Sequence, residues 1–584
     1  MPSRKRPKRA RKPSPIDGST LQLQPTDRRA YSRIPLVSNL ICDRFYFKPF
    51  FSYQFRRILP KKNVDVEALV AEISSNQLQS CKWLEGLLRL EIEEISRKWQ
   101  KCRIRRMLND CVPPLKDVSY EKMLKQTITF DQLRVFVSKC FSFVIADGFI
   151  GVQNRSVLVD DFAKLLYGAN NCEVLDLKPI FMKLKISESK WIKKCRCQPL
   201  QVILLQDSVR FLFHFVLGCV LSVMKFVEVN NSVKGATVLY RYDVWRTLEK
   251  RGLKDFIELQ RCQSVCLPKG SEEFDGRLMR FQVRPSGLRT IVRNSNKSVL
   301  HRQKQANSIL RYLISVNQSL KRHSGSLALF PRLFASYRDK VLSAPYEKIF
   351  IFTGDICNCF PCINHVEMRK ILDSLTANES KYYVAYDGKY AAGLTEREAR
   401  SRLKGVSRIN VTCKAIPKEE LMKSLDLTRL IKYRDRLLRP HRGVGQGDST
   451  SGSLCELYLS NIERCLEDLV KPENTLFFRY ADDYLIISTS KEEITQILFN
   501  LIYALTENGL EMKMEKMNMN FDFCNSEMEK KSIIKWCGFT ISDKLEVRTA
   551  DALIVRYALF RSISTLTASK TVLSMYPLIH KMTA

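Results

Sequence analysis

Two adjacent carboxylates, Asp482 and Asp483, interrupt an apolar stretch in the segment FFRYADDYLIIS at residues 477–488. Asp-Asp is acceptable turn chemistry, so one interpretation is an ordinary surface hairpin. The other is a divalent-metal site, because hard cations such as Mg²⁺ are held by one or two carboxylates together with substrate phosphates. The stretch alone leaves both interpretations open, and residues elsewhere in the chain decide between them.

A third carboxylate lies upstream, in KIFIFTGDICNCF at residues 348–360. The apolar run from Ile349 to Phe352 predicts a buried strand that delivers Asp355 at its far end. A buried carboxylate is costly unless it pairs with a cation. If this strand and the 477–488 hairpin are neighbours in one sheet, the three aspartates meet. Such a cluster makes a two-metal site, where one ion activates an attacking oxygen and the other stabilises the leaving oxygen.

The composition indicates a globular protein that binds nucleic acid. A chain of 584 residues is long enough for several domains, and 45% hydrophobic with 27% charged residues excludes a disordered chain. Lysine and arginine number 96 against 61 acidic residues, which gives a net charge of +35. That excess is typical of nucleic-acid-binding proteins. Ribosomal and chromatin proteins share it, so the charge indicates the class of partner and leaves the activity open.

The 19 cysteines show no repeated metal-ligand spacing. Cys359-Phe-Pro-Cys362 is a C-x-x-C pattern, but it lacks the second pair or the histidines of a zinc site. We therefore expect free, mostly buried thiols in a reducing compartment.

The chain begins with a dense basic run, MPSRKRPKRARKPSP, at residues 1–15. This composition predicts a nuclear-localisation or nucleic-acid-binding tail, and a merely solvated disordered end is the alternative. The most membrane-like segment, residues 211–224, is 14 residues long and shorter than a span requires. It predicts a buried helix and no membrane partner.

Helical and strand patterns divide the chain. Helical periodicity dominates from about residue 45 to 200, and residues 225–245 predict a β-hairpin with a longer loop. Strands and helices alternate from 346 to 550, as in an α/β or α+β domain. In residues 129–145, one helix face is predicted to be apolar: Leu133, Phe136, Val137, Cys140, Phe141 and Val144. A second helix, beginning near Ser451, is predicted to present Leu454, Leu457, Tyr458, Cys465, Leu466 and Leu469.

Four motifs in a fixed order resemble the palm of reverse transcriptases. They are Asp355 with Phe360, then Gln446-Gly447, then Tyr480-Ala481-Asp482-Asp483, then Trp536-Cys537-Gly538. The segment KFVEVNNSVKGATVLYRYDVW upstream resembles the T motif of telomerase reverse transcriptases. MKLKISESKWIKKC and FDQLRVFVSKCF resemble the CP and QFP regions of that family, and RLMRFQVRPSGLRTIV resembles its motifs 1 and 2. The resemblance spans roughly residues 125–550.

The resemblance implies a role for each matching residue. Asp355, Asp482 and Asp483 would hold two Mg²⁺ ions while a DNA 3′-hydroxyl attacks a deoxynucleotide. Lys516 matches a lysine that donates a proton to pyrophosphate, although a solvated lysine is the alternative. Phe360 would exclude a 2′-hydroxyl, unless it is an ordinary core aromatic. The remaining positions would bind nucleotide (Arg284, Arg289, Gln446 and Gly447) or form the primer grip (Trp536, Cys537 and Gly538).

The resemblance also implies RNA binding by the first half of the chain. Tryptophan beside lysine or arginine suits base stacking and phosphate contact, although a tryptophan in a helix more often belongs to the core. The residues implied are Lys190, Trp191, Lys193, Lys194, Tyr240, Arg241 and Trp245.

Three features depart from the family. Arg284 stands where a lysine is usual, and Tyr480 where a leucine is usual. Only 33 residues follow Asp551, so we expect a shortened form with a vestigial thumb and without an evident N-terminal anchor domain.

The predicted fold is multidomain, a mainly helical RNA-binding domain followed by an α+β right-hand polymerase with fingers and palm. The predicted boundaries are a basic disordered tail at 1–45, an RNA-binding domain at 46–250, fingers at 251–345, a palm at 346–550 and a truncated thumb at 551–584.

The predicted function is that of a telomerase catalytic subunit in the nucleus, at chromosome ends. Its predicted partners are telomerase RNA, single-stranded telomeric DNA, deoxynucleotides and telomere-associated proteins. A retroelement or group II intron-like reverse transcriptase is one alternative, but it would lack the T-motif hairpin. A non-catalytic RNA-binding relative is the other, and the presence of all three aspartates disfavours it.

Overall fold

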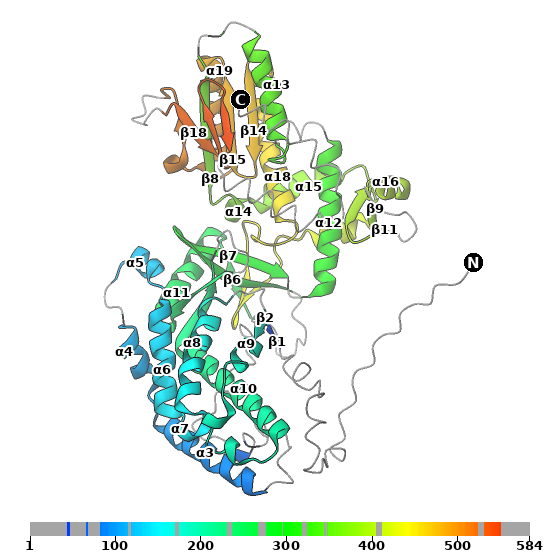
Figure 1. Cartoon of the computed structure of the whole chain (residues 1–584). Coiled ribbons are helices and arrows are strands. Elements are labelled where there is room, and N and C mark those ends of the chain that lie inside the picture. The colour runs from blue at the N-terminus through cyan, green and yellow to red at the C-terminus, as the bar shows by residue number, and fades with distance from the viewer. Residues whose placement is uncertain are drawn as a thin grey trace, which may run out of the picture. The chain divides into compact units, whose positions relative to one another are not determined.

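The computed structural model forms two compact units. One contains residues 1–251 and 281–289, and the other contains 252–280 and 290–584 (Figure 1). The basic tail and the predicted thumb lie outside the described residues. The structure describes 44–46, 66–67, 70, 82–114, 118–169, 174–229, 236–266, 276–294, 296–317, 324–343, 346, 348–403, 411–523 and 531–549.

The first unit is mainly helical (Figure 1). Helix α6 (Phe130–Val144) begins at a capping box, in which Thr129 and Gln132 satisfy each other's backbone N–H groups. Its buried residues are the six predicted from the apolar periodicity, so that prediction is confirmed. The other helices are α3 (Lys82–Lys101), α4 (Ile104–Cys111), α5 (Tyr120–Lys125), α7 (Asp147–Ile150), α8 (Val152–Tyr167), α9 (Lys178–Phe181), α10 (Gln198–Val223) and α11 (Tyr242–Leu259), with short 3₁₀ turns at Ile186–Glu188 and Ile192–Lys194.

Helix α10 contains the apolar segment at 211–224 and is longer than the sequence pattern indicated. Among the described residues, it is one helix of 26 residues with the length and apolarity to cross a membrane. Most of its apolar residues are buried in the core that it shares with α3, α6 and α8. The predicted buried helix is therefore confirmed.

Two short antiparallel pairs complete this unit. Strands β3 (Met224–Glu228) and β4 (Thr237–Arg241) pair with Lys225 opposite Tyr240, which confirms the predicted hairpin. Strands β1 (Arg44–Tyr46) and β2 (Val174–Asp176) form the other pair.

The second unit is built on a five-stranded sheet, in which four strands follow the order β14-β15-β8-β16 and β17 also pairs with β8. Alternate residues of its central strands face opposite ways, so the sheet is buried on both sides. On one side Tyr484 and Ile486 pack with α12, α15, α18 and α19. On the other, Leu485 and Ile487 pack with α13 and the β18–β19 hairpin. The strands are β8 (Phe350–Cys357), β14 (Thr475–Tyr480), β15 (Asp483–Ser488), β16 (Glu511–Met512) and β17 (Asn518–Met519).

The covering helices are α12 (Lys297–Val316), α13 (Phe330–Leu342), α15 (His365–Leu375), α18 (Ser451–Ile462) and α19 (Lys491–Glu507). The predicted helix after Ser451 is wrong in its second half. It ends at Ile462 and tightens into a 3₁₀ turn at Glu463–Leu466, which leaves Cys465 exposed. Loss of the helical period after residue 462 explains why Cys465 leaves the apolar face.

Three further sheets accompany this core. The five-stranded one is ordered β5-β13-β12-β6-β7, and the tip of its β6–β7 hairpin, residues 281–289, groups with the first unit. Its strands are β5 (Gln263–Val265), β6 (Arg277–Arg284), β7 (Gly287–Asn294), β12 (Ile431–Tyr433) and β13 (Arg436–Arg439). The others comprise β9 (Lys381–Tyr386), β10 (Tyr390–Gly393) and β11 (Thr412–Pro417), and β18 (Ile533–Trp536), β19 (Phe539–Ser542) and β20 (Val547–Thr549). The remaining helices are α14 (Cys359–Cys362), α16 (Glu396–Ser401) and α17 (Lys418–Ser424).

Replacing Ile486 by alanine is expected to destabilise the second unit by about 2–5 kcal/mol, because the side chain is fully buried in β15. Ile533, which is 56% exposed on β18, provides the matched control, with an expected cost within about 0.5 kcal/mol. Urea unfolding of the full chain followed by tryptophan fluorescence measures both. Equal costs for the two variants would contradict the assignment of Ile486 to the core.

Candidate catalytic site

Strand register brings the predicted carboxylates together. Asp483, the first residue of β15, lies directly opposite Asp355 near the end of β8. Opposed residues of an antiparallel pair project from the same face, with Cβ atoms about 4.5–5.5 Å apart. Asp482 lies in the two-residue turn that joins β14 to β15, and its carbonyl accepts a hydrogen bond from the Ile356 N–H at 3.3 Å. The sheet thus sets Asp355 opposite Asp483 with Asp482 in the adjoining turn, and a metal site built from all three stays a prediction.

Lys516 places a positive charge against this cluster. Its ammonium group forms an ion pair with Oδ2 of Asp355, a buried carboxylate. The hydrogen bond from Lys516 to Asp355 raises the pKa of the lysine. The backbone supports the pairing, since the N–H of Lys513, the residue directly before the turn that carries Lys516, donates to the Asp355 carbonyl at 2.7 Å.

The Asp483 carboxylate lies close to the negative charges of Asp355 and Asp482. Burial, followed by the charges of Asp355 and Asp482, raises the pKa of Asp483 to about 6. The Cys537 thiol lies 3.6 Å from its Oδ2 and donates to it. Burial, with the charge of Asp483 next, raises the pKa of this thiol far above its usual value, so it stays a neutral donor. Three carboxylates crowded in this way favour a bound cation.

The donor set fits a hard divalent ion. In the described part of the chain no three His, Cys, Asp or Glu side chains already converge as a metal cluster. At this site the ammonium group of Lys516 is the positive charge that Asp355 contacts. Carboxylate oxygens are the ligands that Mg²⁺ prefers, so Asp355, Asp482 and Asp483 are suited to hold it.

The predicted primer-grip turn borders the cluster. Cys537 and Gly538 join β18 to β19 with φ values of 44° and 86°, the backbone that a tight two-residue hairpin requires. Trp536 lies in the core, with its ring 5.0 Å from that of Phe330. The turn therefore contacts Asp483 through Cys537, and the buried Trp536 holds the turn against the core.

The Gln446-Gly447 segment packs tightly against β7. Gly447 has a φ of 101°, and a Cβ there would meet Cγ2 of Ile291 at 3.0 Å. The Gln446 carbonyl accepts from the Val292 N–H at 2.8 Å. Both the backbone conformation and this close approach require glycine at position 447.

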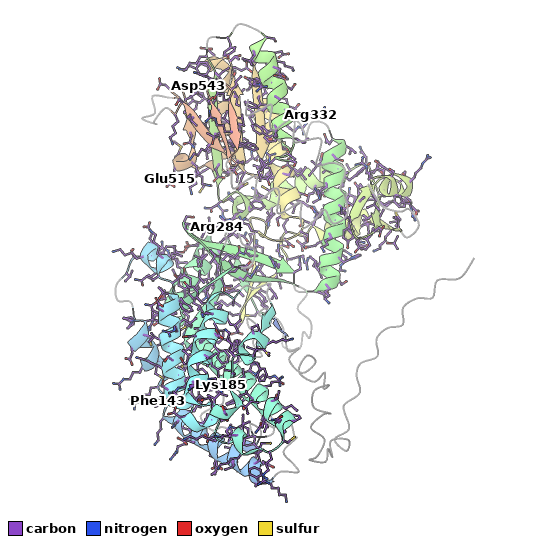
Figure 2. The ribbon with its side chains drawn as sticks, in the orientation of Figure 1. Phe143, Lys185, Arg284, Arg332, Glu515 and Asp543 are labelled. Carbon is purple, nitrogen blue, oxygen red and sulfur yellow. The ribbon has the colours of Figure 1, made fainter. Side chains whose placement is uncertain are left out.

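The other predicted nucleotide-binding residues lie on two elements. Phe360, in α14, is half-buried against the core, and its carbonyl accepts from Val444, which links the Asp355 motif to the Gln446 segment. Arg284 and Arg289 lie at the tip of the β6–β7 hairpin, where Figure 2 labels Arg284. Their contact with a nucleotide stays a prediction.

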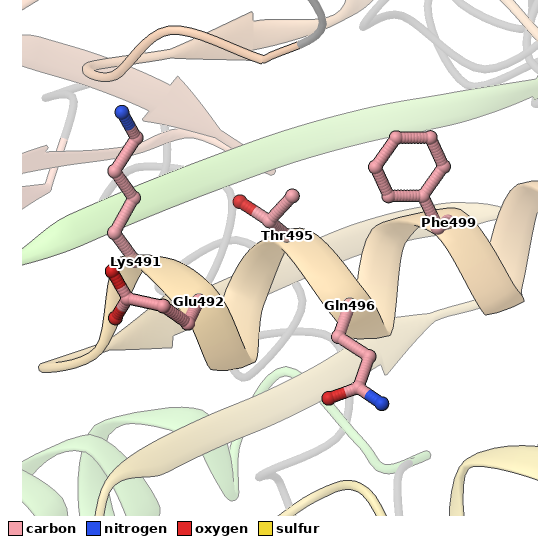
Figure 3. Close-up of a pocket in the computed structure, with 5 residues that line it drawn as sticks. All are labelled: Lys491, Glu492, Thr495, Gln496 and Phe499. Atoms are coloured by element: carbon pink, nitrogen blue, oxygen red, sulfur yellow. The ribbon is translucent and has the colours of Figure 1, made fainter.

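The surface of α19 carries a separate shallow hollow. Figure 3 shows its lining residues, which all come from this one helix and include no predicted site residue: Lys491, Glu492, Thr495, Gln496 and Phe499.

Residues 280–541 match the family model described as reverse transcriptase (RNA-dependent DNA polymerase). The telomerase reverse transcriptase of Mus musculus is 21% identical over 71% of this chain and 43% of its own length. That of Takifugu rubripes is 22% identical over 77% of this chain and 48% of its own. A solved structure of telomerase from Candida albicans with a fragment of telomeric RNA covers 92% of this chain and 86% of that one, with a TM-score of 0.70 and 17% identity.

The chain is thus similar to telomerase reverse transcriptases over most of its length, and its second half matches the reverse transcriptase model. It spans about half the length of the curated relatives that it matches. The predicted fold class, a helical unit followed by an α+β polymerase, is confirmed by the model and by this structural likeness. The predicted domain boundaries stay predictions, and the thumb lies outside the described residues.

Four of the seven residues predicted to bind RNA are buried in this structure. Trp191, Tyr240 and Trp245 are buried, and the Trp191 indole donates to the Phe149 carbonyl at 3.0 Å. Arg241 is also buried, and it donates to Asn109 and Asp243. These side chains hold the unit together and present no surface to RNA in this structure, because the T-motif strand and the turn after Ser189 pack inward.

Three lysines of the same prediction are exposed. Lys190, Lys193 and Lys194 project from the 3₁₀ segment around the buried Trp191. The tryptophan thus positions the segment, and the lysines provide its charged surface. Their contact with RNA stays a prediction.

The sequence analysis did not predict a buried charged network at the hairpin formed by β14 and β15, which carries Asp482 and Asp483. Arg479, in β14, is fully buried and forms ion pairs with Glu463 and Glu456 of the helix that follows Gln446-Gly447. The only signal in the sequence was an arginine inside an apolar run, FFRY. Asp448 was missed as well, although its carboxylate accepts from Asn294 at 2.6 Å and braces the Gln446 segment.

Replacing Asp483 by asparagine is expected to stabilise the metal-free protein above pH 6 by about 1–2 kcal/mol. The folded pKa of about 6 exceeds the ordinary value of 3.8, so the wild type loses stability as the pH rises between them. Asparagine never ionises, so the difference should vanish below about pH 4. Urea unfolding in EDTA at pH 4 and 7.5 measures it, with the exposed Asp373→Asn as control.

Added Mg²⁺ should reverse that order at pH 7.5, because a cation held by the carboxylates stabilises the folded wild type more than the variant. An Asp483→Asn protein that is no more stable than wild type in EDTA would contradict the charge crowding.

Proposed function

We propose that this chain is the catalytic subunit of a telomerase, an RNA-directed DNA polymerase that extends chromosome 3′ ends from an RNA template. The observation that carries the proposal is the register of β8 and β15, which sets Asp355 opposite Asp483 with Asp482 in the adjoining turn. The homology to telomerase reverse transcriptases supports the choice of reaction.

The three aspartates would hold two Mg²⁺ ions, which would supply an activated 3′-oxygen and charge neutralisation at the triphosphate when bound. The contribution of the chain is to fix the carboxylates in one corner of a rigid sheet, so little reorganisation is needed as charge develops. The ion pair between Lys516 and Asp355 supports a role for Lys516 as the group that would donate a proton to the pyrophosphate leaving group.

Residues elsewhere in the chain would define the substrate. Arg284 and Arg289 supply guanidinium groups for the triphosphate, which they can grip through two parallel hydrogen bonds. Phe360 beside Asp355 provides the apolar surface that would exclude a ribose 2′-hydroxyl. Gln446 and Gly447, held against β7, would contact the template–nucleotide pair, and the Cys537-Gly538 turn would hold the primer terminus.

The first unit would bind the telomerase RNA. The related Candida albicans telomerase was solved with a telomeric RNA fragment, and Lys190, Lys193 and Lys194 supply exposed positive charge in this chain. The basic run at residues 4–12 supports nuclear import and action at telomeres, with single-stranded telomeric DNA, deoxynucleotides and telomere-associated proteins as partners.

Asp355→Asn is expected to lower nucleotide incorporation at least about 1,000-fold, since the cluster loses a charge that directly holds the metal. The complex is immunopurified from its own cells and given a telomere-like DNA primer, Mg²⁺ and deoxynucleotides. Asp373→Asn on α15 provides an exposed control that should retain activity. A ladder that survives Asp355→Asn would refute the proposed site.

Ribonuclease pretreatment is the second arm of this assay. Loss of the ladder supports a bound template. A ladder obtained only with an added RNA template would instead indicate a retroelement-like polymerase.

Removing the three exposed lysines together, Lys190, Lys193 and Lys194, by alanine is expected to weaken RNA binding and to flatten its salt dependence by about 0.7–0.9 in log–log slope per lost phosphate contact. Filter binding of the copurified RNA at several salt concentrations measures this. Trp191→Ala should instead lower thermal stability, because the indole is 2% exposed. An unchanged salt slope in the triple variant would contradict RNA contact by this segment.

A further inference from the structure

Arg479 is a fully buried arginine three residues before the metal-binding Asp482. Its side chain has no exposed surface, although it lies in the strand that carries the catalytic hairpin. An arginine remains charged at all physiological pH values, so its burial requires compensating partners. It has them on two sides.

The first side is the helix that follows Gln446-Gly447. The Arg479 Nε donates to Glu463, and its Nη1 donates to Glu456 at 3.1 Å. Nη2 donates to the Ser460 hydroxyl at 3.1 Å. Glu463 also accepts from the Tyr484 hydroxyl of β15 at 2.9 Å, so the network includes both strands of the hairpin.

The second side is the turn itself. Nη1 of Arg479 donates to the Ala481 carbonyl at 2.8 Å. Ala481 has a φ of 57°, in the left-handed region that costs a non-glycine residue roughly 1 kcal/mol or more. The guanidinium group therefore holds a strained turn whose next two residues are Asp482 and Asp483.

The site where α18 ends fits this arrangement. The helix changes to a 3₁₀ turn at Glu463–Leu466, beginning at the residue that faces Arg479. Buried ion pairs contribute little net stability compared with apolar packing of the same volume. Precise placement is what the planar, forked guanidinium group offers here.

We propose that Arg479 is a positioning residue for catalysis, which with Glu463 and Glu456 fixes the Ala481-Asp482 turn and couples it to α18. This inference rests on the proposed polymerase function. Arg479 touches no substrate, so it acts through Asp482 and Asp483. Its network also ties the metal hairpin to the helix that carries the Gln446-Gly447 segment at its start.

Arg479→Lys is the central variant, because lysine keeps the charge and loses the fork that reaches two carboxylates and the turn carbonyl together. Glu456→Gln is the second, since Glu456 is 23% exposed and its loss leaves the Arg479–Glu463 pair intact. Arg369→Lys, in an exposed ion pair with Asp373, is the matched control.

Two readouts separate positioning from folding. Hydrogen exchange of the peptide covering residues 477–488 in the full chain should rise about 10-fold in Arg479→Lys, and less in Glu456→Gln, with unchanged exchange in β9 and α17. Primer extension on poly(rA)·oligo(dT) with Mg²⁺ should show kcat reduced about 10–100-fold and KM for the deoxynucleotide changed less than about 2-fold. Arg369→Lys should alter neither.

Unchanged exchange at residues 477–488 in both variants would overturn the proposal. Faster exchange throughout the second unit in both variants would also overturn it, since the network would then be merely structural. Faster local exchange with unaltered kcat would show that the turn does not position the carboxylates. If the wild type itself extends no primer, the proposed function fails, and the exchange data alone then decide whether Arg479 holds the turn.

Discussion

The pairing of β8 with β15 sets three negative charges in one corner of a sheet, and the rest of the second unit keeps them there. Asp355 and Asp483 face each other across this pair, and burial, followed by their repulsion, raises the pKa of Asp483. Such an arrangement opposes folding in the absence of a cation. It persists because both strands are packed on both faces, so the register cannot slip without exposing an entire hydrophobic set.

Two turns with strained backbone border the same corner. Ala481 and Cys537 both have positive φ values without being glycine, and each lies in a turn beside the aspartates. Backbone of this kind persists where neighbouring contacts hold it. The Arg479 guanidinium holds the first turn, and the buried Trp536 anchors the hairpin of the second. The rigid surroundings therefore place the carboxylates before any substrate arrives.

In the first unit, a single motif contains both buried residues that stabilise the fold and exposed residues that provide charge on the surface. In the segment around Trp191 the indole is buried and hydrogen-bonded, whereas the neighbouring lysines are exposed. Tyr240 behaves like the tryptophan, since its hydroxyl donates to the Leu124 carbonyl at 2.5 Å inside the unit. A motif associated with RNA binding can thus combine buried residues, which hold the segment in place, with exposed residues, which form its charged surface.

Patterns that depend on local period were predictable from the sequence. The buried face of α6, the β3–β4 hairpin and the strand–turn–strand around Asp482 follow from spacings of 3.6 and 2 residues. The order of the four motifs also indicated the polymerase fold, because each motif specifies its own turn or strand. These features depend on neighbours in the chain, so the sequence alone contains them.

Relations between distant segments were decided only by the tertiary structure. The strand register determines that Asp483, and not Asp482, lies opposite Asp355. The sequence alone does not decide this, because the two aspartates are adjacent in the same hairpin. Burial of Trp191 inside the core, and the end of α18 at Ile462, depend on elements far along the chain. The partners of Arg479 lie 16 and 23 residues away on a helix, and no spacing rule relates them to it. Long-range packing, which sets which side chains are desolvated together, supplied what the local pattern could not.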